Sequence, residues 1–333
     1  MTGKLPPELM DPVYRYTGSR DPDVLVGPAV GEDAAVIKLP DGHYLVVHSD
    51  PITEASARVG WLAVNIAAND IAVTGARPRW ATLVILLPEG AARMLEPIVS
   101  DAHRAAEKLG IMIVGGHTEE SPGLSKPTVV ATVQGITRRY VATSGVKPGD
   151  DIIAVKHAGI EGTAILATDF VNILERLDVP VRIIEKARRL IEEISVVDPA
   201  LAIADIADSM HDPTEGGVLG ALYEMAYASK TTIEVWEDKI PVLPETLTIC
   251  DALGIDPLRL ISSGCLLAAT PPEKTSEALR RLRSKGYTAE VIGVARTGEP
   301  KVILHRRDGE VEEITGFVKD EIARLWELAP PHT

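Results

Sequence analysis

The order of apolar and polar residues predicts short strands and amphipathic helices that alternate along most of the chain. Runs rich in β-branched residues, such as "YLVVHS" at residues 44–49 and "TVVATVQGI" at 128–136, are typical of strands. Residues 91–109 and 181–194 instead repeat their apolar positions every three or four residues, which predicts helices. Neither half of the chain shows a GxGxxG turn or an order of six parallel strands. We therefore predict an α+β fold rather than one doubly wound sheet.

A turn-forming stretch, "KPGDD" at residues 147–151, divides this pattern into two parts. Before residue 25 the chain is irregular and rich in proline. We predict an N-terminal arm at residues 1–24, an N-terminal domain at 25–145 and a C-terminal domain at 146–333. The predicted strands are mostly long and apolar, which indicates that both faces of each sheet are covered. In the N-terminal domain one of these covers could be a partner subunit.

The segment "WLAVNIAANDIAVTGARP" at residues 61–78 predicts a helix that is apolar on nearly every face. It nevertheless carries Asn65, Asn69 and Asp70. A buried polar side chain without a hydrogen bond costs about 1 to 3 kcal/mol, so each of the three needs a partner. Asn65 could find its partner within the helix packing. No Lys or Arg precedes Arg77 in this helix, so Asp70 is expected to take up a proton, meet a cation or bind a metal ion.

Three further aspartates stand where predicted elements begin or end: Asp33 before a strand, Asp50 at the end of one, and Asp212 in "HDPTEGG". Such positions present side chains to ligands. Taken singly, each aspartate could equally form a turn or cap a helix. Together with Asp70 they favour a hard cation such as Mg²⁺, which binds a few carboxylates, water and phosphate. Zinc would need clusters of His and Cys, which the sequence lacks.

Glycine-rich stretches supply backbone N–H groups that could approach an anion. They lie at residues 27–33, 114–123, 157–163 and 212–220, and we expect turns at all four. The last one opens a helix, whose N-terminus attracts phosphate. None is a P-loop. With the aspartates they point to a magnesium nucleotide, because phosphoryl transfer needs mainly charge neutralisation and positioning.

Two residues in these stretches are candidates for acid–base chemistry. His117 follows two glycines and could contact phosphate or transfer a proton near neutral pH, or it could be a hydrogen-bonded turn residue. Glu161 could act as an acid or base, or it could be a solvated loop carboxylate. His211 is expected to cap the turn that follows it rather than to react.

Composition narrows the classes of function. The 333 residues carry a net charge of -14, which disfavours a nucleic-acid groove or an anionic membrane surface. No apolar run reaches the about 18 residues of a membrane helix, and Cys250 and Cys265 show no metal or disulfide spacing. We therefore expect a cytoplasmic protein with reduced cysteines in its core. Amides are scarce, with one glutamine and three asparagines, which fits a thermophile.

Five motifs in this order resemble the aminoimidazole-ribotide synthetase superfamily, which also contains thiamine-monophosphate kinase, selenophosphate synthetase and the hydrogenase-maturation protein HypE. The motifs are "VGPAVGEDAAVI", "SDPIT", "VNIAANDIAVTGARP", "GGHTEESPG" and "DPTEGG", and the resemblance spans residues 27–270. The chain is most similar to HypE-like members. The resemblance implies a two-domain PurM-like α+β fold, with an N-terminal domain that forms a shared β-barrel in a homodimer and a C-terminal α/β domain. It also implies an ATP site that uses both subunits, with Mg²⁺ between aspartates and phosphates.

Carried to this chain, the resemblance also implies particular site residues. The Mg²⁺ ligands would be Asp33, Asp50 and Asp70. The nucleotide would lie beside a second set, with Asp212 near its phosphates: Gly31, Asn69, Gly115, Gly116, Thr118, Asp212, Thr214, Gly216 and Gly217. The shared chemistry is ATP-dependent phosphorylation of an oxygen or selenium nucleophile, often to activate an amide-like oxygen for loss.

The sequence departs from each of these relatives. HypE ends in a cysteine that carries a carbamoyl group, whereas this sequence ends in "ELAPPHT", so the cyanide-forming step is not expected. His117 stands where thiamine-monophosphate kinase usually has an aspartate. Lys4 is the only group comparable to the reactive Cys or Sec of selenophosphate synthetase.

Three hypotheses remain. The leading one is a Mg-ATP-dependent enzyme of the HypE-like branch that activates a small-molecule or protein-tail substrate, with hydrogenase maturation as one setting. The second is a small-molecule kinase of the thiamine-phosphate type. The third is a nucleotide-binding partner of a maturation complex that lacks the terminal-cysteine chemistry. None of them involves nucleic acid or a membrane.

Overall fold

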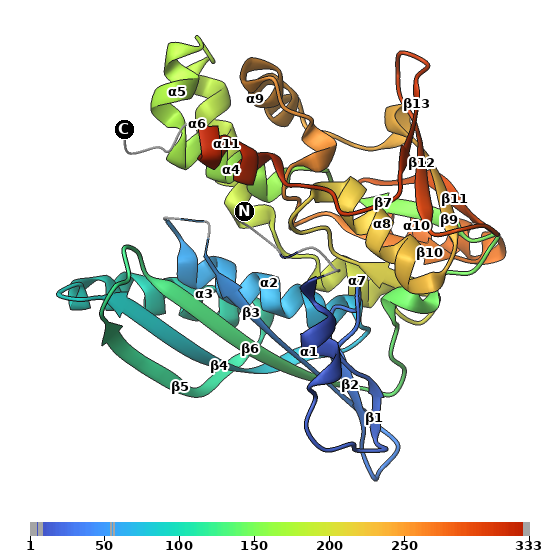
Figure 1. The fold of residues 1–333 in the computed structure, drawn as a ribbon, viewed down its shortest axis with the longest axis horizontal. Coiled ribbons are helices and arrows are strands. Elements are labelled where there is room, and N and C mark those ends of the chain that lie inside the picture. Colours follow the sequence, from blue (N-terminus) through green and yellow to red (C-terminus); the bar gives the residue numbers. More distant parts are fainter. Residues whose placement is uncertain (1–4, 6–8, 54, 56, 329–333) are drawn as a thin grey trace.

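The computed structural model describes residues 5, 9–53, 55 and 57–328, which form two sheets and the helices that pack on them (Figure 1). The first sheet has six strands in the order β1-β2-β3-β6-β4-β5. Its neighbouring strands are antiparallel except for β4 and β5, which are parallel. The strands are β1 (Val24–Val26), β2 (Ala35–Lys38), β3 (Tyr44–Ile52), β4 (Arg77–Pro88), β5 (Met112–Ser121) and β6 (Thr128–Thr137).

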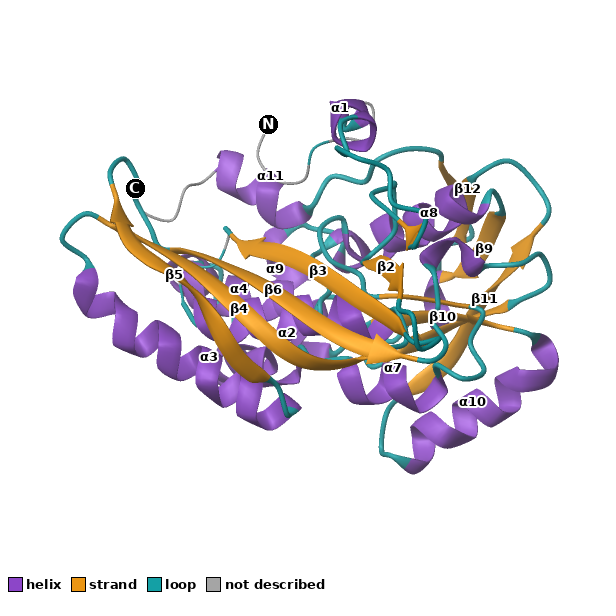
Figure 2. Cartoon of the chain, turned by 90° about the horizontal axis from the view of Figure 1, so that it is seen from below, coloured by secondary structure: helices purple, strands orange, loops and turns teal. Residues whose placement is uncertain are grey.

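Two helices, α2 (Val59–Val73) and α3 (Leu95–Leu109), cover one face of this sheet. Figure 2 looks onto the opposite face, where strands β3, β6, β4 and β5 lie in front of the helices. Every residue of α2 is buried, as its uniformly apolar sequence requires. α3 is amphipathic and packs closely on α2 at Gly60, which has no side chain. A Cβ at Gly60 would lie only 2.0 Å from the main-chain oxygen of Ile98.

The second sheet has seven strands in the order β13-β12-β9-β11-β7-β10-β8. Only β9 and β12 pair in parallel. The strands are β7 (Asp151–Val155), β8 (Ser209–His211), β9 (Thr232–Trp236), β10 (Leu266–Thr270), β11 (Ala289–Arg296), β12 (Lys301–His305) and β13 (Val311–Ile314). The six-stranded sheet therefore uses residues before 138, and the seven-stranded sheet uses residues after 150.

The remaining helices lie mostly in the second half of the chain. The α-helices are α1 (Asp11–Arg15), α4 (Ile160–Asp169), α5 (Val171–Arg176), α6 (Val181–Arg189), α7 (Val197–Ile203), α8 (Gly217–Ser229), α9 (Pro244–Leu253), α10 (Pro272–Ser284) and α11 (Glu321–Leu328). The 3-10 helices are η2 (Ala92–Met94), η3 (Thr143–Gly145), η4 (Leu190–Glu193), η5 (Glu237–Lys239) and η6 (Pro257–Arg259).

Several predicted elements are confirmed and others differ. The strands at 44–49 and 128–136 and the helix at 91–109 are present, the last with a 3-10 first turn. The turn predicted at 114–123 is wrong, because β5 continues through residue 121. Asp50 lies within β3 rather than at its end, and the arm, predicted as irregular, contains the short helix α1.

The two cysteines lie in the core, as their sequence context predicts. Cys250 and Cys265 are both free and buried, and burial raises the pKa of each thiol. Among the described residues, no helix combines the length and apolar character needed to cross a membrane. Lys4 and the last five residues of the "ELAPPHT" stretch lie outside the described residues.

The segment at residues 191–196, between α6 and α7, ties the two domains together. Nε1 of Trp61, on α2, donates a hydrogen bond of 2.8 Å to the Ile191 oxygen. From the C-terminal domain, Lys156 donates to two other main-chain oxygens of the segment. Burial lowers the pKa of this lysine to about 8. The N-terminal domain is thus bonded to a stretch of main chain that Lys156 holds within the C-terminal domain.

Candidate active site

A cavity of about 830 Å³ lies where the two domains meet. Its N-terminal wall comes from the loop before β2, from β3 and from α2, and its C-terminal wall from α4, β8 and α8. No Lys or Arg is among the described residues that line it. The carboxylates that line it come from both domains: Glu32, Asp33, Asp50, Asp70, Glu161, Asp212, Glu215 and Glu224. The predicted aspartates, far apart in sequence, therefore converge on one volume.

Asp33 lies in the loop before β2 and is held on both sides. Its Oδ1 is 2.6 Å from Nδ1 of His211, and its Oδ2 accepts a hydrogen bond of 3.0 Å from Oγ1 of Thr143. Gly31, two residues earlier, has a φ of 83°, and a Cβ there would lie 2.9 Å from the main-chain oxygen of Glu224. The glycine lets the loop press against α8. The Asp33 carboxylate therefore has a fixed direction at the cavity wall.

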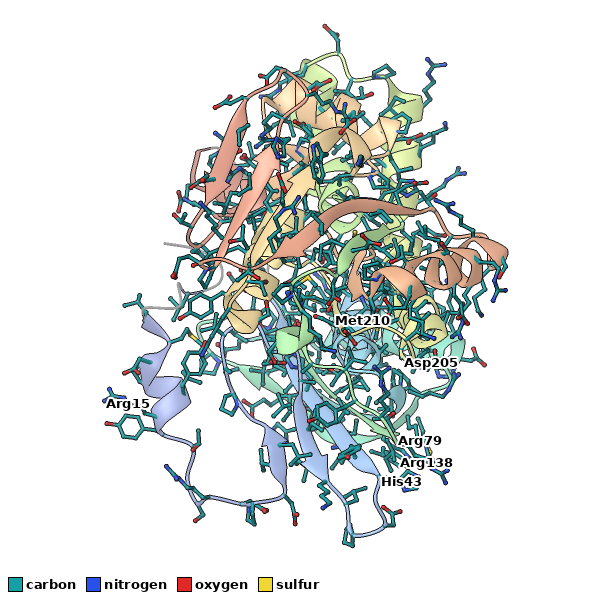
Figure 3. The ribbon with its side chains drawn as sticks, turned by 90° about the vertical axis from the view of Figure 1, so that its right-hand side faces the viewer. Arg15, His43, Arg79, Arg138, Asp205 and Met210 are labelled. Atoms are coloured by element: carbon teal, nitrogen blue, oxygen red, sulfur yellow. The ribbon has the colours of Figure 1, made fainter. Side chains whose placement is uncertain are left out.

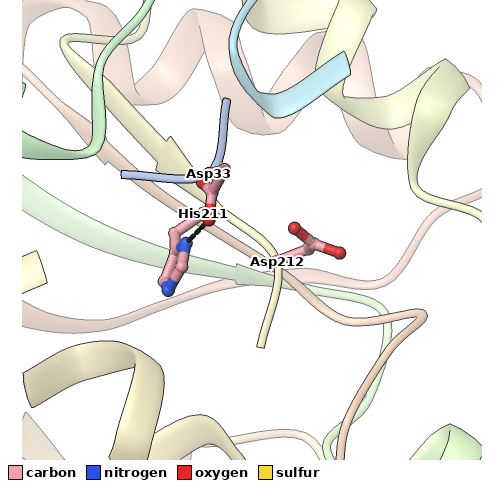
Figure 4. Close-up of side chains that lie close together, drawn as sticks. All are labelled: Asp33, His211 and Asp212. Carbon is pink, nitrogen blue, oxygen red and sulfur yellow. Dashed lines mark ion pairs between the residues drawn. The ribbon is translucent and has the colours of Figure 1, made fainter. Parts of the chain in front are cut away.

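His211 ends β8 and lies between two carboxylates. Its Nδ1 faces Asp33 (Figure 4), and its Nε2 is 3.0 Å from Oε2 of Glu224 on α8. Burial alone would lower the pKa of this imidazole, but Asp33 and Glu224 raise it to about 10 through charge and hydrogen bonds. Met210, the preceding residue, lies in the interior of the molecule (Figure 3). The expectation that His211 caps the following turn is wrong, since both ring nitrogens face acids.

Asp212 follows in the chain and is only 1% exposed. Neither of its side-chain oxygens has a hydrogen-bond partner among the described residues. Burial and the nearby charge of Asp33 raise the pKa of Asp212 to about 8. A carboxylate in this position is costly unless a proton or a cation balances its charge.

Asp70 reaches the cavity from the middle of α2, where it is 6% exposed. Its Oδ2 lies 3.5 Å from Nε2 of His48 on β3. The partner that the helix itself lacks is therefore an imidazole of the neighbouring strand. Asp50 lies two residues further along the same strand and lines the same cavity.

These residues fit a hard divalent cation. One ligand atom from each of Asp33, His211 and Asp212 lies within 4.8 Å of the others (Figure 4). A cation would satisfy the two buried oxygens of Asp212. Asp50 and Asp70 complete an oxygen-rich wall of the kind that Mg²⁺ prefers. The assignment of Asp33, Asp50 and Asp70 as Mg²⁺ ligands stays a prediction with which this geometry agrees.

Four further predicted residues divide into two pairs. Glu161 and Thr214 line the cavity. Glu161 lies in the first turn of α4 and is 3% exposed, so it is not a solvated loop carboxylate. Gly216 and Gly217 lie at the start of α8 and are not among the described lining residues. The main-chain nitrogen of Gly216 instead donates to Oδ2 of Asp320 (2.8 Å).

Asn69 binds the main chain of the segment at 191–196 and does not line the cavity. Its Nδ2 donates to the Ile194 oxygen (2.9 Å), and its Oδ1 accepts from the Val196 nitrogen (2.8 Å). The residue is fully buried and is not among the described lining residues. Its side chain makes a contact between the domains, and its contact with a nucleotide stays a prediction. Asn65 donates to the Trp61 oxygen one turn earlier (2.9 Å), as expected of a partner within the helix.

The stretch at residues 115–118 lies on β5, at the edge of the N-terminal sheet, and is not among the described lining residues. The side chain of His117 is 64% exposed, with Nε2 3.2 Å from Oε2 of Glu119. It lies in a strand, so its interpretation as a turn residue is wrong. Gly116 is needed for strand pairing, because a Cβ there would lie 1.8 Å from the Leu83 oxygen. Contact of Gly115, Gly116 or Thr118 with a nucleotide would require a second subunit.

Comparison with known proteins finds relatives over most of the chain. A protein of Methanocaldococcus jannaschii named for hydrogenase expression and formation is 33% identical over 281 residues, which are 82% of this chain and 79% of the relative. Carbamoyl dehydratase HypE of Rhodobacter capsulatus is 29% identical over 86% of this chain and 84% of the relative. Since these relatives include enzymes, the prediction that the chain is an enzyme is confirmed.

Solved structures share the architecture. HypE in complex with ATP matches with a TM-score of 0.67 at 24% identity, over 93% of this chain and 90% of that chain. ThiL complexed with AMPPCP and TMP matches with a TM-score of 0.73 at 21% identity, over 93% of this chain and 95% of that chain. The predicted two-domain PurM-like α+β fold is confirmed by these matches.

The family is shown by two domain descriptions. "AIR synthase related protein, N-terminal domain" matches residues 31–137, and "AIR synthase related protein, C-terminal domain" matches residues 147–305. These matches cover β2 to β6 of the first sheet, β7 to β12 of the second and most of the described residues that line the cavity. The chain therefore belongs to the AIR synthase related protein family.

Proposed function

We propose that this protein is a Mg-ATP-dependent enzyme of the HypE-like branch, which phosphorylates an amide-like oxygen of its substrate and so activates that oxygen for loss. One observation supports this most directly. Carboxylates from both domains line a single cavity, and among them Asp212 is buried with two oxygens that no described residue bonds. A wall of this kind suits divalent cations that in turn bind phosphate.

The protein's own groups would divide the work. Asp33, Asp50 and Asp70 would hold Mg²⁺, with Asp212 beside them, and the bound metal would neutralise charge on the transferring phosphoryl group. Asp33 is held in one direction by His211 and Thr143, so it needs no rearrangement to serve as a ligand. Glu161, which is buried at the start of α4, is the group placed to hold or accept a proton of the substrate.

The charge of the cavity also favours one class of acceptor. A substrate that carries its own phosphate is normally held by Arg or Lys, and the described lining contains neither. His48 and His211 are its basic residues, and each already faces a carboxylate. A neutral amide acceptor is therefore favoured over a phosphate ester such as thiamine monophosphate.

The relatives support the setting of the reaction. The names of the Methanocaldococcus and Rhodobacter proteins concern hydrogenase formation and carbamoyl dehydration, and one solved HypE was captured with ATP. We therefore place this reaction in hydrogenase maturation in the cytoplasm. A maturation protein that presents the amide, as a small molecule or as a protein tail, would be its partner.

A homodimer is part of the same proposal. β5 is an edge strand, and its Met112 and Val114 side chains are 67% and 53% exposed. An exposed apolar edge is a surface on which another strand can pair. Pairing there would continue the N-terminal sheet into a second subunit and would bring residues 115–118 toward a partner's nucleotide.

The proposed function is tested by identifying the phosphorus-containing products of the reaction. The protein is incubated with ATP, Mg²⁺ and a panel of primary amides, carbamoyl compounds and phosphate esters, and products are identified by ³¹P NMR. We expect ADP and phosphate to form faster with an amide or carbamoyl acceptor. The Asp70→Asn variant serves as the inactive control. Transfer to thiamine monophosphate, or slow hydrolysis that no acceptor accelerates, would contradict the proposal.

A further inference from the structure

His211 contacts the predicted metal ligand Asp33 and also a second carboxylate, that of Glu224, which the proposed chemistry does not use. Its two ring nitrogens are 2.6 Å from Oδ1 of Asp33 and 3.0 Å from Oε2 of Glu224. The residue is 4% exposed, and its ring lies between these two carboxylates. It therefore links the loop that carries Asp33 to helix α8.

The bridge also spans the two domains. Asp33 belongs to the N-terminal sheet region, whereas His211 and Glu224 belong to β8 and α8 of the C-terminal domain. β8 is itself held, because His211 pairs with Leu267 of the neighbouring strand β10. Glu32, next to Asp33, accepts hydrogen bonds from the main-chain nitrogens of Thr143 and Ser144. The loop that carries Asp33 is thus fixed both to His211 of the other domain and to residues 143 and 144 near the end of its own domain.

The bonds to Asp33 leave it able to bind a metal ion. An ionised carboxylate has about four lone-pair sites, and two are used by His211 and Thr143. These two contacts fix the direction in which the remaining lone pairs of the Asp33 carboxylate point. Asp212, next in the chain to His211, makes no side-chain hydrogen bond to a described residue and lies within the same ligand cluster. One short stretch of chain therefore supplies both a ligand and the group that orients another ligand.

We propose that His211 is a positioning residue that bridges Asp33 to Glu224 and so fixes the Asp33 carboxylate, across the domain boundary, in the direction needed to bind the divalent cation. The proposal rests on the cation site of the proposed function but not on the identity of the substrate. Groups that orient a metal-binding side chain in this way typically change metal affinity by about 10- to 100-fold when they are removed.

The experiment measures Mn²⁺ binding to the full-length protein by electron paramagnetic resonance, without nucleotide, for wild type, His211→Gln and His305→Gln. His305 is the matched control, because its Nε2 lies 2.9 Å from Oε1 of Glu234 and it is not among the described cavity residues. We expect Mn²⁺ to bind His211→Gln about 10- to 100-fold more weakly and His305→Gln within about 2-fold of wild type. Equal affinity in folded His211→Gln and wild type would overturn the proposal.

A second variant guards against a folding defect in His211→Gln. Glu224→Gln changes the far end of the bridge and leaves Asp33 and His211 in place. If His211 positions Asp33, Glu224→Gln should keep the wild-type unfolding midpoint in urea and should bind Mn²⁺ about 3- to 10-fold more weakly. This loss is smaller than the one expected for His211→Gln, because His211 itself stays in place. A role in folding alone predicts the opposite result, a lowered midpoint with unchanged affinity.

The Mn²⁺ spectrum separates positioning from direct ligation. An imidazole nitrogen bound to the metal gives a strong ¹⁴N coupling in electron spin echo modulation, and we expect none in wild type. Such a coupling that disappears in His211→Gln would make His211 a ligand and overturn the proposal. If wild type binds Mn²⁺ with the expected dependence on His211 but transfers no phosphoryl group, only the proposed function fails. If wild type binds no Mn²⁺, both fail.

Discussion

The cavity wall and the edge strand β5 contain similar sequence motifs but differ in structure. Both contain glycines next to polar residues, "DPTEGG" in one and "VGGHTEES" in the other. In the first, Asp212 is 1% exposed and faces acids from another domain. In the second, the His117 side chain is 64% exposed and faces Glu119 of its own strand. Chemistry therefore depends on whether the tertiary fold brings distant groups around a motif.

The same contrast occurs within a single helix. Asn65 and Asn69 are one turn apart on α2 and are both buried. Asn65 bonds its own helix, whereas Asn69 holds both Ile194 and Val196 of the other domain. Asp70, the next residue, reaches the cavity. α2 therefore links the cavity to the contact between domains through adjacent residues.

The largest expected effect is on Mg-ATP affinity, and it compares a cavity aspartate with an exposed one. Asp70→Asn should weaken Mg-ATP binding by at least about 100-fold, because a neutral amide is a poor ligand for a hard cation. Isothermal titration calorimetry measures the affinity. Asp238→Asn, an exposed aspartate of η5, is the matched control and should bind normally. Normal binding by Asp70→Asn would remove this residue from the metal site.

The next effect separates the two asparagines of α2. Asn69→Ala should lower the free energy of unfolding by about 2 to 4 kcal/mol, because it leaves the buried main-chain groups of residues 194 and 196 without their partner. Asn65→Ala removes one bond within the helix and should cost about 1 kcal/mol. Urea unfolding measures both values. Equal losses would show that the bonds of Asn69 to the other domain add nothing to stability.

The third effect is a pH dependence that two cavity residues, His211 and Asp212, produce between pH 6.5 and 8. The folded pKa of His211 is about 10 against 6.5 for an ordinary histidine, so its contribution to stability is complete below pH 6.5 and is lost as the pH rises toward 10. The pKa of Asp212 is about 8 in the folded protein, against 3.8 for an ordinary aspartate. The folded state therefore holds an extra proton between these pH values, and the contribution of Asp212 to stability is lost as the pH rises from 3.8 to 8.

Urea unfolding in EDTA at several pH values tests this sign. Each proton that the folded state holds in excess lowers the free energy of unfolding by about 1.4 kcal/mol per pH unit as the pH rises. Metal-free wild type should therefore lose stability between pH 6.5 and 8, below the range in which Lys156, with a pKa of about 8, contributes with the opposite sign. His211→Gln should lose less. A wild-type stability that rises over this range would contradict the bridge between Asp33 and Glu224.

The smallest effect belongs to β5. His117→Ala should change the free energy of unfolding by no more than about 0.5 kcal/mol, because the side chain is mostly exposed. Mg-ATP affinity in the same titration should stay within about 3-fold of wild type, since exposed ion pairs contribute little. A tenfold loss of affinity would instead bring β5 into the site of a partner subunit, which would reduce the contrast between the two regions.

Several features of the protein follow from the sequence by itself. The periodicity of α3 and the β-branched runs of β3 and β6 identify these elements, because local patterning reflects which face is buried. The isolated charge in α2 marks Asp70 as a residue in need of a partner, because burial without one is costly. The motifs identify the family, and with it the expected aspartates and the two-domain fold.

Other features were decided only by the tertiary structure. The bridge of His211 joins residues 178 positions apart, Asp33 and His211, and no local pattern encodes such a distance. The partner of Asp70 is His48 on a neighbouring strand, and that of Asn69 is main chain, which leaves no side-chain signal in the sequence. Local sequence determines which groups must be paired, because desolvation is a property of each group. Which groups meet depends on how two domains pack, and that is decided by contacts distant in sequence.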